Sequence, residues 1–454
     1  MASTYLTNTN PTAGNRTKGT ISCWFKRSGL SSNQWIYSER LNSTDYAGVR
    51  INSGDNIGIF SYNGGSAEID ANTNAKFRDT NGWYHFVANW DTSLATASDR
   101  VKIWINGELQ SFSGSPSYPS QNSNTKFGIG SPSGINYDIT IGRRGDDAEY
   151  FDGSMAHYHR VDNQTLAPTV FGETDSTTGE WKINTSPSIT YTGSSSFNFF
   201  VLKDGNSVTD QSGQSNDLTV GGGTLTKTED NPSNVFCTLN PLVYTPNPPT
   251  FSNGNTKFVK STTGIGHGSD TIGTLGAKSG KYYFEMKTVT STSFYVGIIG
   301  NNHNNANSNG DIGGSNIHTV NPDNTYGDNV NNNGTTTSIT LSYSANDIFG
   351  LAFDLDNGKW YFHINGTYFN SGDPTSGSTG TGSMGNITTG ELFYLPFAGG
   401  GSYNHQHTFE FNFGNGYFGS TQISSAGTNA SGIGIFEYDV PTGYTALSTK
   451  GLNL

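Results

Sequence analysis

Charged residues are scarce in this 454-residue chain, in which Asp, Glu, Lys and Arg together make up 13%. An average soluble domain contains about 25%. The charges sum to −12, and no run rich in Lys and Arg occurs. Because nucleic-acid binding needs clustered cations on the protein, we expect no nucleic-acid partner.

Long apolar runs are also missing. No stretch reaches the roughly 18 apolar residues of a membrane-spanning helix, and the N-terminal MASTYLTNTNPTAGNR has no apolar signal region. We therefore expect neither membrane insertion nor conventional secretion. The chain has two cysteines, Cys23 and Cys237, too few for a disulfide framework. We expect two buried free thiols, with one long-range bridge as the alternative.

Aromatic residues and glycine, in contrast, are abundant, at 13% and 59 residues respectively. This aromatic content supplies material for hydrophobic cores, which argues against disorder. Short segments of alternating apolar and polar residues are separated by Gly, Asn and Ser turns throughout, which predicts an all-β fold. The best candidate for a short helix is 165–171.

The clearest β-hairpin lies between residues 346 and 373. Alternating apolar residues flank an Asn-Gly pair at 357–358, which is typical of a two-residue type I′ turn. Such a turn predicts that Leu355 faces Trp360 and that Phe353 faces Phe362, with these side chains on one face of the sheet.

Two further Asn-Gly pairs predict tight turns, at 365–366 and 106–107. The first of them returns Phe369 beside Phe362. The second ends a strand that follows WYHFVANW, at residues 83–90. The same pattern therefore occurs in both halves of the chain, and a length of this order suits two or three domains.

We predict two antiparallel β-sandwich (jelly-roll) domains, at 1–173 and 250–454. The segment 174–249 is expected to supply bridging strands and a Pro-rich linker, because it contains FNFFVLKD and ends in several prolines. Residues 300–334 are rich in Asn and are expected to form a long loop. Asn304 and Asn324 in this loop are candidate sugar contacts, because amides offer donors and acceptors to hydroxyls. A solvated loop or a subunit contact is the alternative.

The first domain resembles a laminin-G-like, concanavalin-A-type jelly roll. The resemblance rests on the Trp-x-His strand at 83–87, the strand at 101–107 that ends in Asn-Gly, and the motifs Ile-Gly-Arg at 141–143 and Phe-Asp-Gly at 151–153. It implies calcium-binding loops at the rim, and hard carboxylates in a flexible loop are suitable ligands. The candidates are Asp146, Asp147, Glu149 and Asp152. An acidic loop that is merely solvated is the alternative.

The second domain resembles a SPRY domain, through GKYYFE at 280–285, VGI at 296–298, NDIFG at 346–350 and FHING at 362–366. The two domains together resemble structural proteins of marine bacteriophages. This resemblance implies a virion surface protein, such as a tail fibre, a short appendage or a head decoration, that serves host attachment or glycan binding. It also implies other virion proteins as partners and a homo-oligomer, for which we favour a trimer. A stand-alone carbohydrate-binding protein is the alternative.

A polysaccharide depolymerase is the enzymatic alternative, because concanavalin-A-type folds include glycoside hydrolases. One such family carries three acids on one strand, of which Glu68 and Asp70 match the first two. The third position holds Thr73, which cannot protonate a leaving group as that chemistry requires. We therefore expect no catalytic residues.

Binding candidates remain. Tyr46, Tyr62 and Tyr150 lie in or near expected turns and are suited to stack on sugar rings of a host surface glycan. The alternative is that they fill cores or protomer contacts. Two His-x-His pairs, at 157/159 and 405/407, have the spacing to chelate a metal from one strand face, with isolated surface histidines as the alternative.

Overall fold

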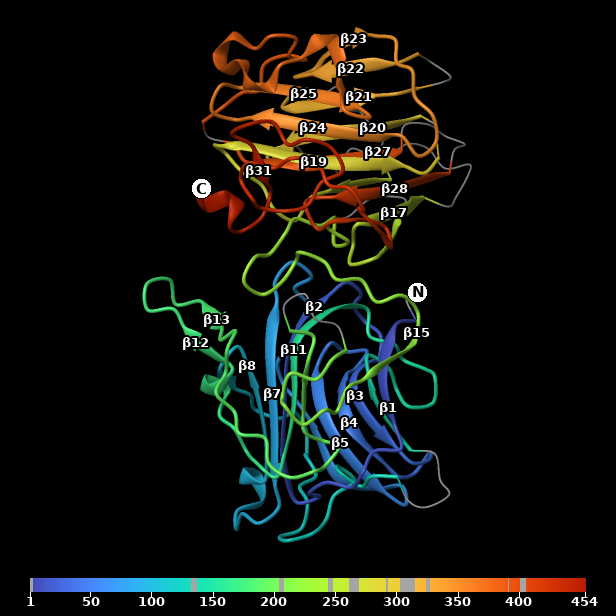
Figure 1. The fold of residues 1–454 in the computed structure, drawn as a ribbon, viewed down its shortest axis with the longest axis vertical. Helices are drawn as coiled ribbons and strands as arrows, with labels where there is room; N and C mark the ends of the chain where they lie inside the picture. Colours follow the sequence, from blue (N-terminus) through green and yellow to red (C-terminus); the bar gives the residue numbers. More distant parts are fainter. Residues whose placement is uncertain are drawn as a thin grey trace. The chain divides into compact units, whose positions relative to one another are not determined.

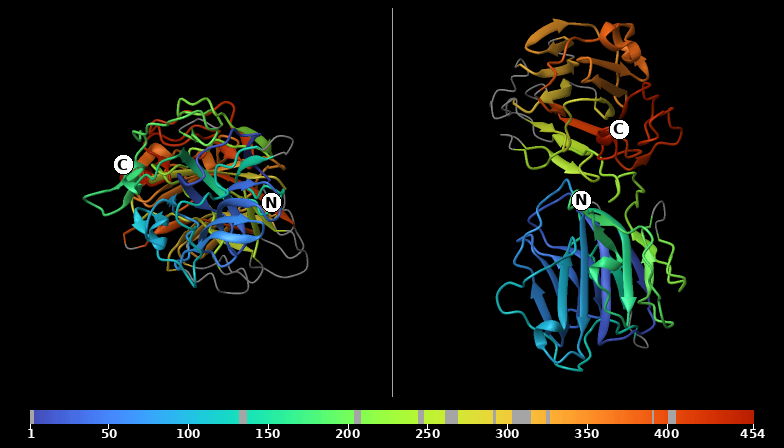
Figure 2. Two further views of the ribbon diagram at one scale, coloured as in Figure 1. Left: turned by 90° about the horizontal axis from the view of Figure 1, so that it is seen from below. Right: turned by 90° about the vertical axis from the view of Figure 1, so that its left-hand side faces the viewer.

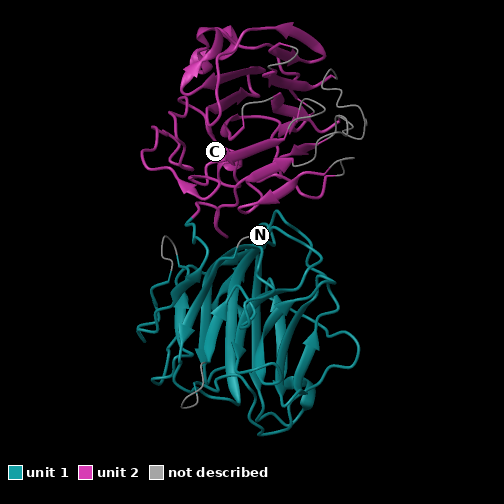
Figure 3. Cartoon of the chain, turned by 90° about the vertical axis from the view of Figure 1, so that its right-hand side faces the viewer, with its two compact units in different colours: residues 1–227 teal, residues 228–454 magenta. Residues whose placement is uncertain are grey.

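The computed structural model describes residues 3–131, 137–203, 208–243, 248–260, 269–290, 293–302, 315–323, 327–390, 392–400 and 406–454. The chain divides into two compact units, residues 1–227 and 228–454 (Figure 3). Each unit has its own antiparallel sheets and its own hydrophobic core. The all-β prediction is confirmed.

The first unit is a sandwich of two sheets. Its strands are β1 (Tyr5–Thr9), β2 (Lys18–Arg27), β3 (Gln34–Arg40), β4 (Tyr46–Ile51), β5 (Ile57–Asn63), β6 (Ser66–Asn72), β7 (Tyr84–Asp91), β8 (Val101–Ile105), β9 (Glu108–Leu109), β10 (Asp138–Ile141), β11 (Gly153–Asp162), β12 (Gly172–Thr174), β13 (Trp181–Ile183), β14 (Phe199–Val201) and β15 (Thr219–Gly222).

Seven of the described strands form one sheet, in the order β15-β1-β10-β3-β4-β5-β6, and six form the other, in the order β14-β11-β2-β7-β8-β9. Figure 1 shows β3, β4 and β5 in one layer and β2, β7 and β11 in the other, and Figure 2 gives two further views. β12 and β13 pair only with each other among the described strands.

Alternation along the strands places every second side chain between the two sheets. Val49 of β4 and Ile59 of β5 come from one sheet, and Ile21 and Phe25 of β2 come from the other. All four side chains are fully buried in one cluster. Each large apolar side chain buried in this way stabilises the fold by about 1.5–3 kcal/mol.

The turn predicted at 106–107 is confirmed. Asn106 has φ 50° and Gly107 has φ 80°, the left-handed pair that a type I′ turn requires. Ile105 and Glu108 are directly paired across this two-residue connection.

The segment 174–249 is shared between the two units. Its strands β14 and β15 pair with β11 and β1 and extend the two sheets of the first unit. Cys237 and Leu239 are instead buried in the core of the second unit. The chain therefore divides after Lys227, within the segment that the sequence suggested as a bridge.

The strands of the second unit are β16 (Thr250–Ser252), β17 (Lys257–Lys260), β18 (Asp270–Ile272), β19 (Lys281–Thr288), β20 (Phe294–Gly300), β21 (Ile317–Asn321), β22 (Asn329–Asn332), β23 (Thr335–Ser338), β24 (Ile348–Asp354), β25 (Lys359–Ile364), β26 (Thr367–Tyr368), β27 (Tyr394–Gly400), β28 (His407–Asn412), β29 (Tyr417–Phe418), β30 (Thr421–Gln422) and β31 (Thr445–Ala446). One sheet has the order β16-β17-β28-β19-β24-β25-β26, with β31 beside β19, and the other has the order β18-β27-β20-β21-β22-β23.

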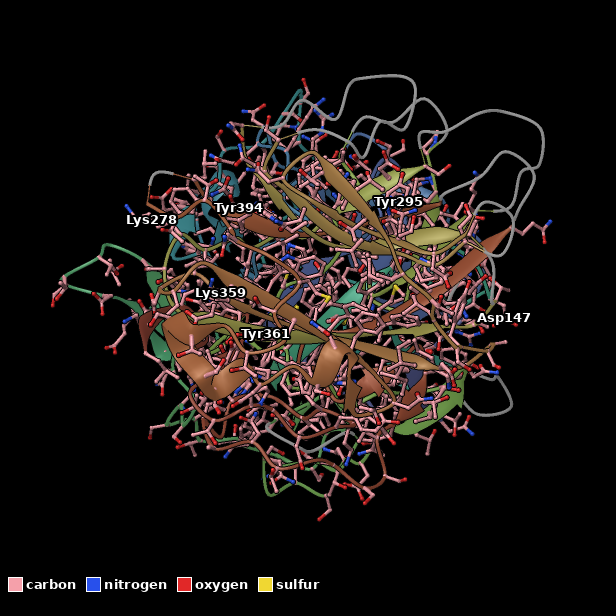
Figure 4. The ribbon with its side chains drawn as sticks, turned by 90° about the horizontal axis from the view of Figure 1, so that it is seen from above. Asp147, Lys278, Tyr295, Lys359, Tyr361 and Tyr394 are labelled. Atoms are coloured by element: carbon pink, nitrogen blue, oxygen red, sulfur yellow. The ribbon has the colours of Figure 1, made fainter. Side chains whose placement is uncertain are left out.

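These two sheets also pack face to face. Figure 4 labels Tyr361, which comes from β25, and Tyr295, which comes from β20 in the opposite sheet. Between the sheets lies an aromatic core that includes Phe284, Phe349 and Phe411, all fully buried.

The register predicted for the β24–β25 hairpin is wrong by two residues. Phe353 pairs with Trp360, and Leu351 pairs with Phe362. Because the shift is an even number of residues, the apolar side chains keep the predicted face.

The side chain of Asp354 explains the shift. Its Oδ1 accepts hydrogen bonds from the backbone N–H groups of Asp356 at 3.0 Å and Asn357 at 2.9 Å. This local cap closes a four-residue connection, 355–358, in which Gly358 has a positive φ of 64° and Asn357 does not. The hydrogen bonds from the turn to the carboxylate of Asp354 therefore favour this longer turn over the two-residue turn that the Asn-Gly pair predicts.

The second Asn-Gly turn of this meander follows the prediction. Asn365 and Gly366 have φ values of 49° and 82°, and Ile364 pairs with Thr367. Phe369 returns to stack on Phe362, with ring centroids 5.1 Å apart.

The prediction of one long loop over 300–334 is wrong, because β21 and β22 lie within it and pair with each other. Val320 and Val330 face each other in this pair and are buried. The burial of these two apolar side chains offsets the conformational entropy that is lost when this polar segment becomes ordered. Asn304 and Asn324 lie outside the described residues.

Helical structure is limited to short 3₁₀ turns among the described residues: η1 (Ala97–Asp99), η2 (Pro168–Val170), η3 (Phe369–Ser371), η4 (Pro374–Thr379) and η5 (Gly451–Asn453). The turn η2 lies inside the predicted 165–171. None of these described helices is long and apolar enough to cross a membrane. Cys23 and Cys237 are buried free thiols, as predicted.

Candidate functional site

The candidate site is the solvent-side face of the seven-stranded sheet in the first unit, over β3, β4, β5 and β6. A β-bulge between Trp35 and Tyr37 shapes this face. Because of the extra residue, Ile36 and Tyr37 both enter the core, whereas Trp35 lies opposite Arg50 on the outer face. Strict alternation would have put Trp35 and Tyr37 on the same side.

Four aromatic rings cover this face, and we call them the aromatic platform: Trp35, Tyr46, Phe60 and Tyr62. The ring centroid of Trp35 lies 6.1 Å from that of Tyr46 and 6.3 Å from that of Phe60. Tyr46 and Tyr62 stack at 5.0 Å with 14° between their planes. Trp35 and Phe60 are 2% and 4% exposed, so they form the floor, and the two tyrosines are partly exposed.

Two glycines make room for the floor rings. A Cβ atom on Gly48 would lie 2.6 Å from Cζ3 of Trp35, and one on Gly58 would lie 2.5 Å from Cζ of Phe60. Both separations are far below van der Waals contact. Glycine at these strand positions therefore allows the two rings to lie against the sheet.

Arg50 lies over the floor. Its guanidinium carbon is 4.7 Å from the ring centroid of Phe60 and 5.7 Å from that of Trp35, within the range of a cation–π interaction. Its Nε is buried and has no hydrogen-bond partner.

Asp70 supplies the acceptor of the platform. The hydroxyl of Tyr62 donates to its Oδ2 at 2.6 Å, and Nδ2 of Asn72 donates to its Oδ1 at 3.1 Å. Burial raises the pKa of Tyr62, and the bond to Asp70 raises it further, so this phenol is held protonated as a donor. The platform thus combines flat apolar rings, a cation and a carboxylate.

The loop 142–152 packs on the neighbouring strands and carries the four calcium candidates. Glu149 accepts a hydrogen bond from Nε1 of Trp35 at 2.6 Å and an ion pair from Arg144 at 3.1 Å. Asp146 pairs with Arg40 at 3.1 Å and with Arg144 at 2.5 Å.

The other two calcium candidates point elsewhere. Asp147, labelled in Figure 4, pairs with Arg143 and has a side chain that is 74% exposed. Burial raises the pKa of Asp152. The structure therefore does not gather the four carboxylates, and guanidinium groups take the place of a metal ion at three of them. Among the described residues, no group of three or more His, Cys, Asp or Glu side chains could hold a metal.

Tyr46 and Tyr62 are brought together on the platform, but Tyr150 is not part of it. Its ring lies 6.3 Å from that of Tyr5 on β1, and β10 and β3 separate β1 from β4 in this sheet. Sequence reasoning missed Trp35, Arg50 and Phe60, and it considered Asp70 only as an acid for hydrolysis. Their strand segments alternate apolar and polar residues, but no local pattern distinguishes an outward aromatic from a core aromatic.

The two acids weighed for hydrolysis are separated by a second β-bulge, at Ser61 and Tyr62 of β5. Glu68 accepts a hydrogen bond from the hydroxyl of Ser61 at 2.7 Å, and Asp70 accepts one from Tyr62. Ser61 and Tyr62 are consecutive, so they point to opposite sides of the sheet. The bulge thus directs the two carboxylates apart.

Histidines 157 and 159 are buried beside a bulge in β11 rather than exposed as a pair. His159 stacks on Phe200 at 3.9 Å and shares a hydrogen bond with the hydroxyl of Tyr191. Burial lowers the pKa of His159, and His157 lowers it further. His407 is also buried, and its predicted partner at 405 lies outside the described residues.

A family comparison supports the reading of the first unit. Residues 2–169 match the model of the concanavalin A-like lectin/glucanases superfamily, in its laminin G form. The first unit thus carries a domain of this type, as its sequence motifs predicted. No curated protein matches the chain.

Solved structures that match parts of the chain include two SPRY domains. The PSpry domain of TRIM65 is 13% identical over 39% of this chain and 91% of its own, with a TM-score of 0.28. The SPRY domain of human HERC1 is 16% identical over 36% of this chain and 91% of its own, with a TM-score of 0.26. A pentraxin from Limulus polyphemus is 14% identical over 34% of this chain and 68% of its own, with a TM-score of 0.25.

Proposed function

We propose that the aromatic platform of the first unit binds carbohydrate, without cleaving it. The observation that carries this proposal is the set of four rings on the outer face of one sheet, beside a carboxylate and a guanidinium. Sugar rings present apolar C–H faces and polar hydroxyl edges, so flat aromatic side chains with a few fixed polar groups complement them. The match of residues 2–169 to a lectin/glucanase superfamily supports the same conclusion.

Removing one ring of the platform should weaken glycan binding. For Tyr62→Ala we expect the Kd of the best ligand on a host-polysaccharide array to rise by roughly five- to tenfold, because the loss of an aromatic contact is worth about 1–1.5 kcal/mol. Isothermal titration calorimetry measures the change.

The matched control is Tyr118→Ala, since Tyr118 is a partly buried tyrosine of the same unit that stands outside the platform, 6.5 Å from Phe112. Equal affinity of wild type and Tyr62→Ala would show that the platform does not bind the sugar. Release of reducing ends that Glu68→Gln abolishes would favour the depolymerase alternative instead.

We propose further that the chain works on the surface of a virion, as a tail fibre, short appendage or head decoration that contacts other virion proteins. The support is the paired sequence motifs of the two halves, including WYHFV at 83–87 and FHING at 362–366, and a composition with only 13% charged residues. A homo-oligomer, with a trimer favoured, fits a role in which several weak sugar sites act together.

Mass spectrometry of purified particles tests this location. We expect the chain to co-purify with the virion at a copy number that is a multiple of three. Its absence from intact particles, together with glycan retention by a free monomer, would favour the stand-alone binding protein.

A further inference from the structure

Arg50 differs from the other arginines of this protein in having neither a hydrogen-bond acceptor nor an ion-pair partner for its side chain among the described residues. The chain contains nine arginines, and all of them lie in the part of the chain that the structure describes. The other eight each donate a side-chain hydrogen bond or form an ion pair: Arg16, Arg27, Arg40, Arg78, Arg100, Arg143, Arg144 and Arg160. Within the described ranges, Arg50 does neither.

The carboxylate of the platform is already engaged, because the two oxygens of Asp70 accept hydrogen bonds from Tyr62 and Asn72. Asp146, Asp147 and Glu149 are paired with Arg40, Arg143 and Arg144 on the adjoining loop and strands. These three acids and three arginines cancel in charge, so the positive charge of Arg50 is not neutralised by them.

The guanidinium is also held in a defined position. Its stacking on Phe60 and Trp35 leaves Nε buried, and the two terminal nitrogens are not among the buried atoms that lack a partner. A planar guanidinium that lies on aromatic rings has already lost most of its rotamer freedom, which lowers the entropic cost of binding an anion with its remaining N–H groups.

We infer that the sugar bound at the platform carries an anionic group, a carboxylate or a sulfate, which Arg50 receives. Either group accepts two parallel hydrogen bonds in the geometry that guanidinium offers. Asp70 would then repel a second anion and accept from a sugar hydroxyl, which orients the ring. This inference rests on the proposed carbohydrate binding and specifies the class of ligand.

Two pairs of polymers with matched backbones test the inference. Polygalacturonate is compared with its fully methyl-esterified form, and dextran sulfate is compared with dextran. We expect at least one acidic polymer to bind tenfold or more tightly than its neutral partner, with affinity that falls as salt is raised. The pair that shows the preference identifies carboxylate or sulfate as the group.

The variant Arg50→Gln should lose this preference by at least tenfold, because only the acidic polymer loses a charged partner. Arg50→Lys should retain part of the preference for the acidic polymer, since lysine keeps the positive charge but lacks the planar guanidinium group. Lys76→Gln is the control, because it removes one positive charge from an exposed position of the same unit. Thermal melts of both glutamine variants show whether Trp35 and Phe60 keep their packing.

The possible results distinguish the proposal that the platform binds carbohydrate from the inference that this carbohydrate is anionic. If neutral and acidic polymers bind equally and Arg50→Gln changes nothing while Tyr62→Ala weakens both, the anionic class is wrong and carbohydrate binding stands. If no polymer of either pair binds, both are overturned. If Lys76→Gln reduces the preference as much as Arg50→Gln, the effect is general electrostatics and the assignment to Arg50 is overturned.

Discussion

Replacing Glu39 with alanine should destabilise the first unit by about 3–5 kcal/mol, the range for leaving one member of a buried ion pair without its partner. Glu39 and Arg160 are both fully buried, with Nη2 of the arginine 3.6 Å from the carboxylate. The hydroxyls of Tyr37 and Tyr137 donate to Glu39 at 2.7 and 2.8 Å, and the backbone N–H of Gly128 donates at 2.7 Å. The substitution therefore leaves the guanidinium of Arg160 without its ion-pair partner and leaves three buried hydrogen-bond donors without an acceptor.

Tryptophan fluorescence during urea unfolding measures this effect. Six of the seven tryptophans lie in the first unit, and only Trp360 lies in the second, so the signal reports chiefly the unit that carries the mutation. We expect a clearly lower midpoint for Glu39→Ala. Glu68→Ala should shift it little, because Glu68 lies on the edge strand β6 and its side chain accepts hydrogen bonds from Ser61 and Asn63 alone among the described residues.

A double mutant identifies the cause. In Glu39→Ala/Arg160→Met the unpaired charge is gone, so the double variant should be more stable than Glu39→Ala alone. Arg160 also lies over Trp90, 4.7 Å from its ring centroid, and methionine retains much of that apolar contact. A double variant that loses the sum of the two single losses would contradict the charge-pair explanation.

Replacing Glu285 with alanine should destabilise the second unit by about 3 kcal/mol or more, because each buried donor left without an acceptor costs about 1–3 kcal/mol. Glu285 is fully buried and accepts four hydrogen bonds. They come from the hydroxyl of Tyr283 at 3.0 Å, Nδ2 of Asn412 at 3.0 Å, and the backbone N–H groups of Glu437 and Tyr438 at 3.0 and 2.9 Å.

Two of these donors belong to the C-terminal segment 427–440, which packs over the sheet through Phe436 and Val440. Hydrogen exchange of peptides from this segment should therefore accelerate more in Glu285→Ala than exchange of peptides from β2 or β7. Glu437→Gln is the control, because only the backbone of Glu437 is used in the contact. Unchanged protection of 427–440 would show that Glu285 does not hold the segment.

The buried carboxyl group of Glu285 should also make the stability of the second unit fall as pH rises. Burial raises the pKa of Glu285 from 4.5 to about 7, against four hydrogen bonds that lower it. The folded state thus retains a proton that the unfolded state has lost, and this contribution to stability is present below pH 4.5 and disappears as pH rises to about 7. Relative to Glu285→Gln, the wild type should lose stability over this window. Comparison with the variant cancels the opposing effect of His318 and His363, whose pKa values burial lowers to about 4.

Apolar alternation and short polar turns were enough to predict the fold class, because each reflects an energy that acts between neighbours along the chain. A strand with one buried face must alternate, and Asn-Gly supplies two left-handed residues cheaply. This is why the turns at 106–107 and 365–366 and the contact of Phe369 with Phe362 could be predicted, and why Val49 and Ile59 are in the core.

The prediction failed where a side chain or an extra residue competes with alternation. Asp354 caps its own turn and moves the register of β24 and β25 by two residues. Bulges at Ile36 and at Glu68 each reverse the faces of the residues that follow. A bulge costs little locally and is chosen by the fit of the whole sheet, so no short window of sequence contains it.

The amino-acid sequence by itself determined that this protein is built of layered antiparallel sheets in two halves, because hydrophobic burial and turn chemistry act over a few residues. The tertiary structure alone decided that Trp35 faces outward, that Gly48 and Gly58 make room for the floor of the platform, and that Arg50 forms no ion pair with any described carboxylate. These features depend on pairing between strands and on which partners remain free once the whole sheet has formed, and those energies exist only in the folded chain.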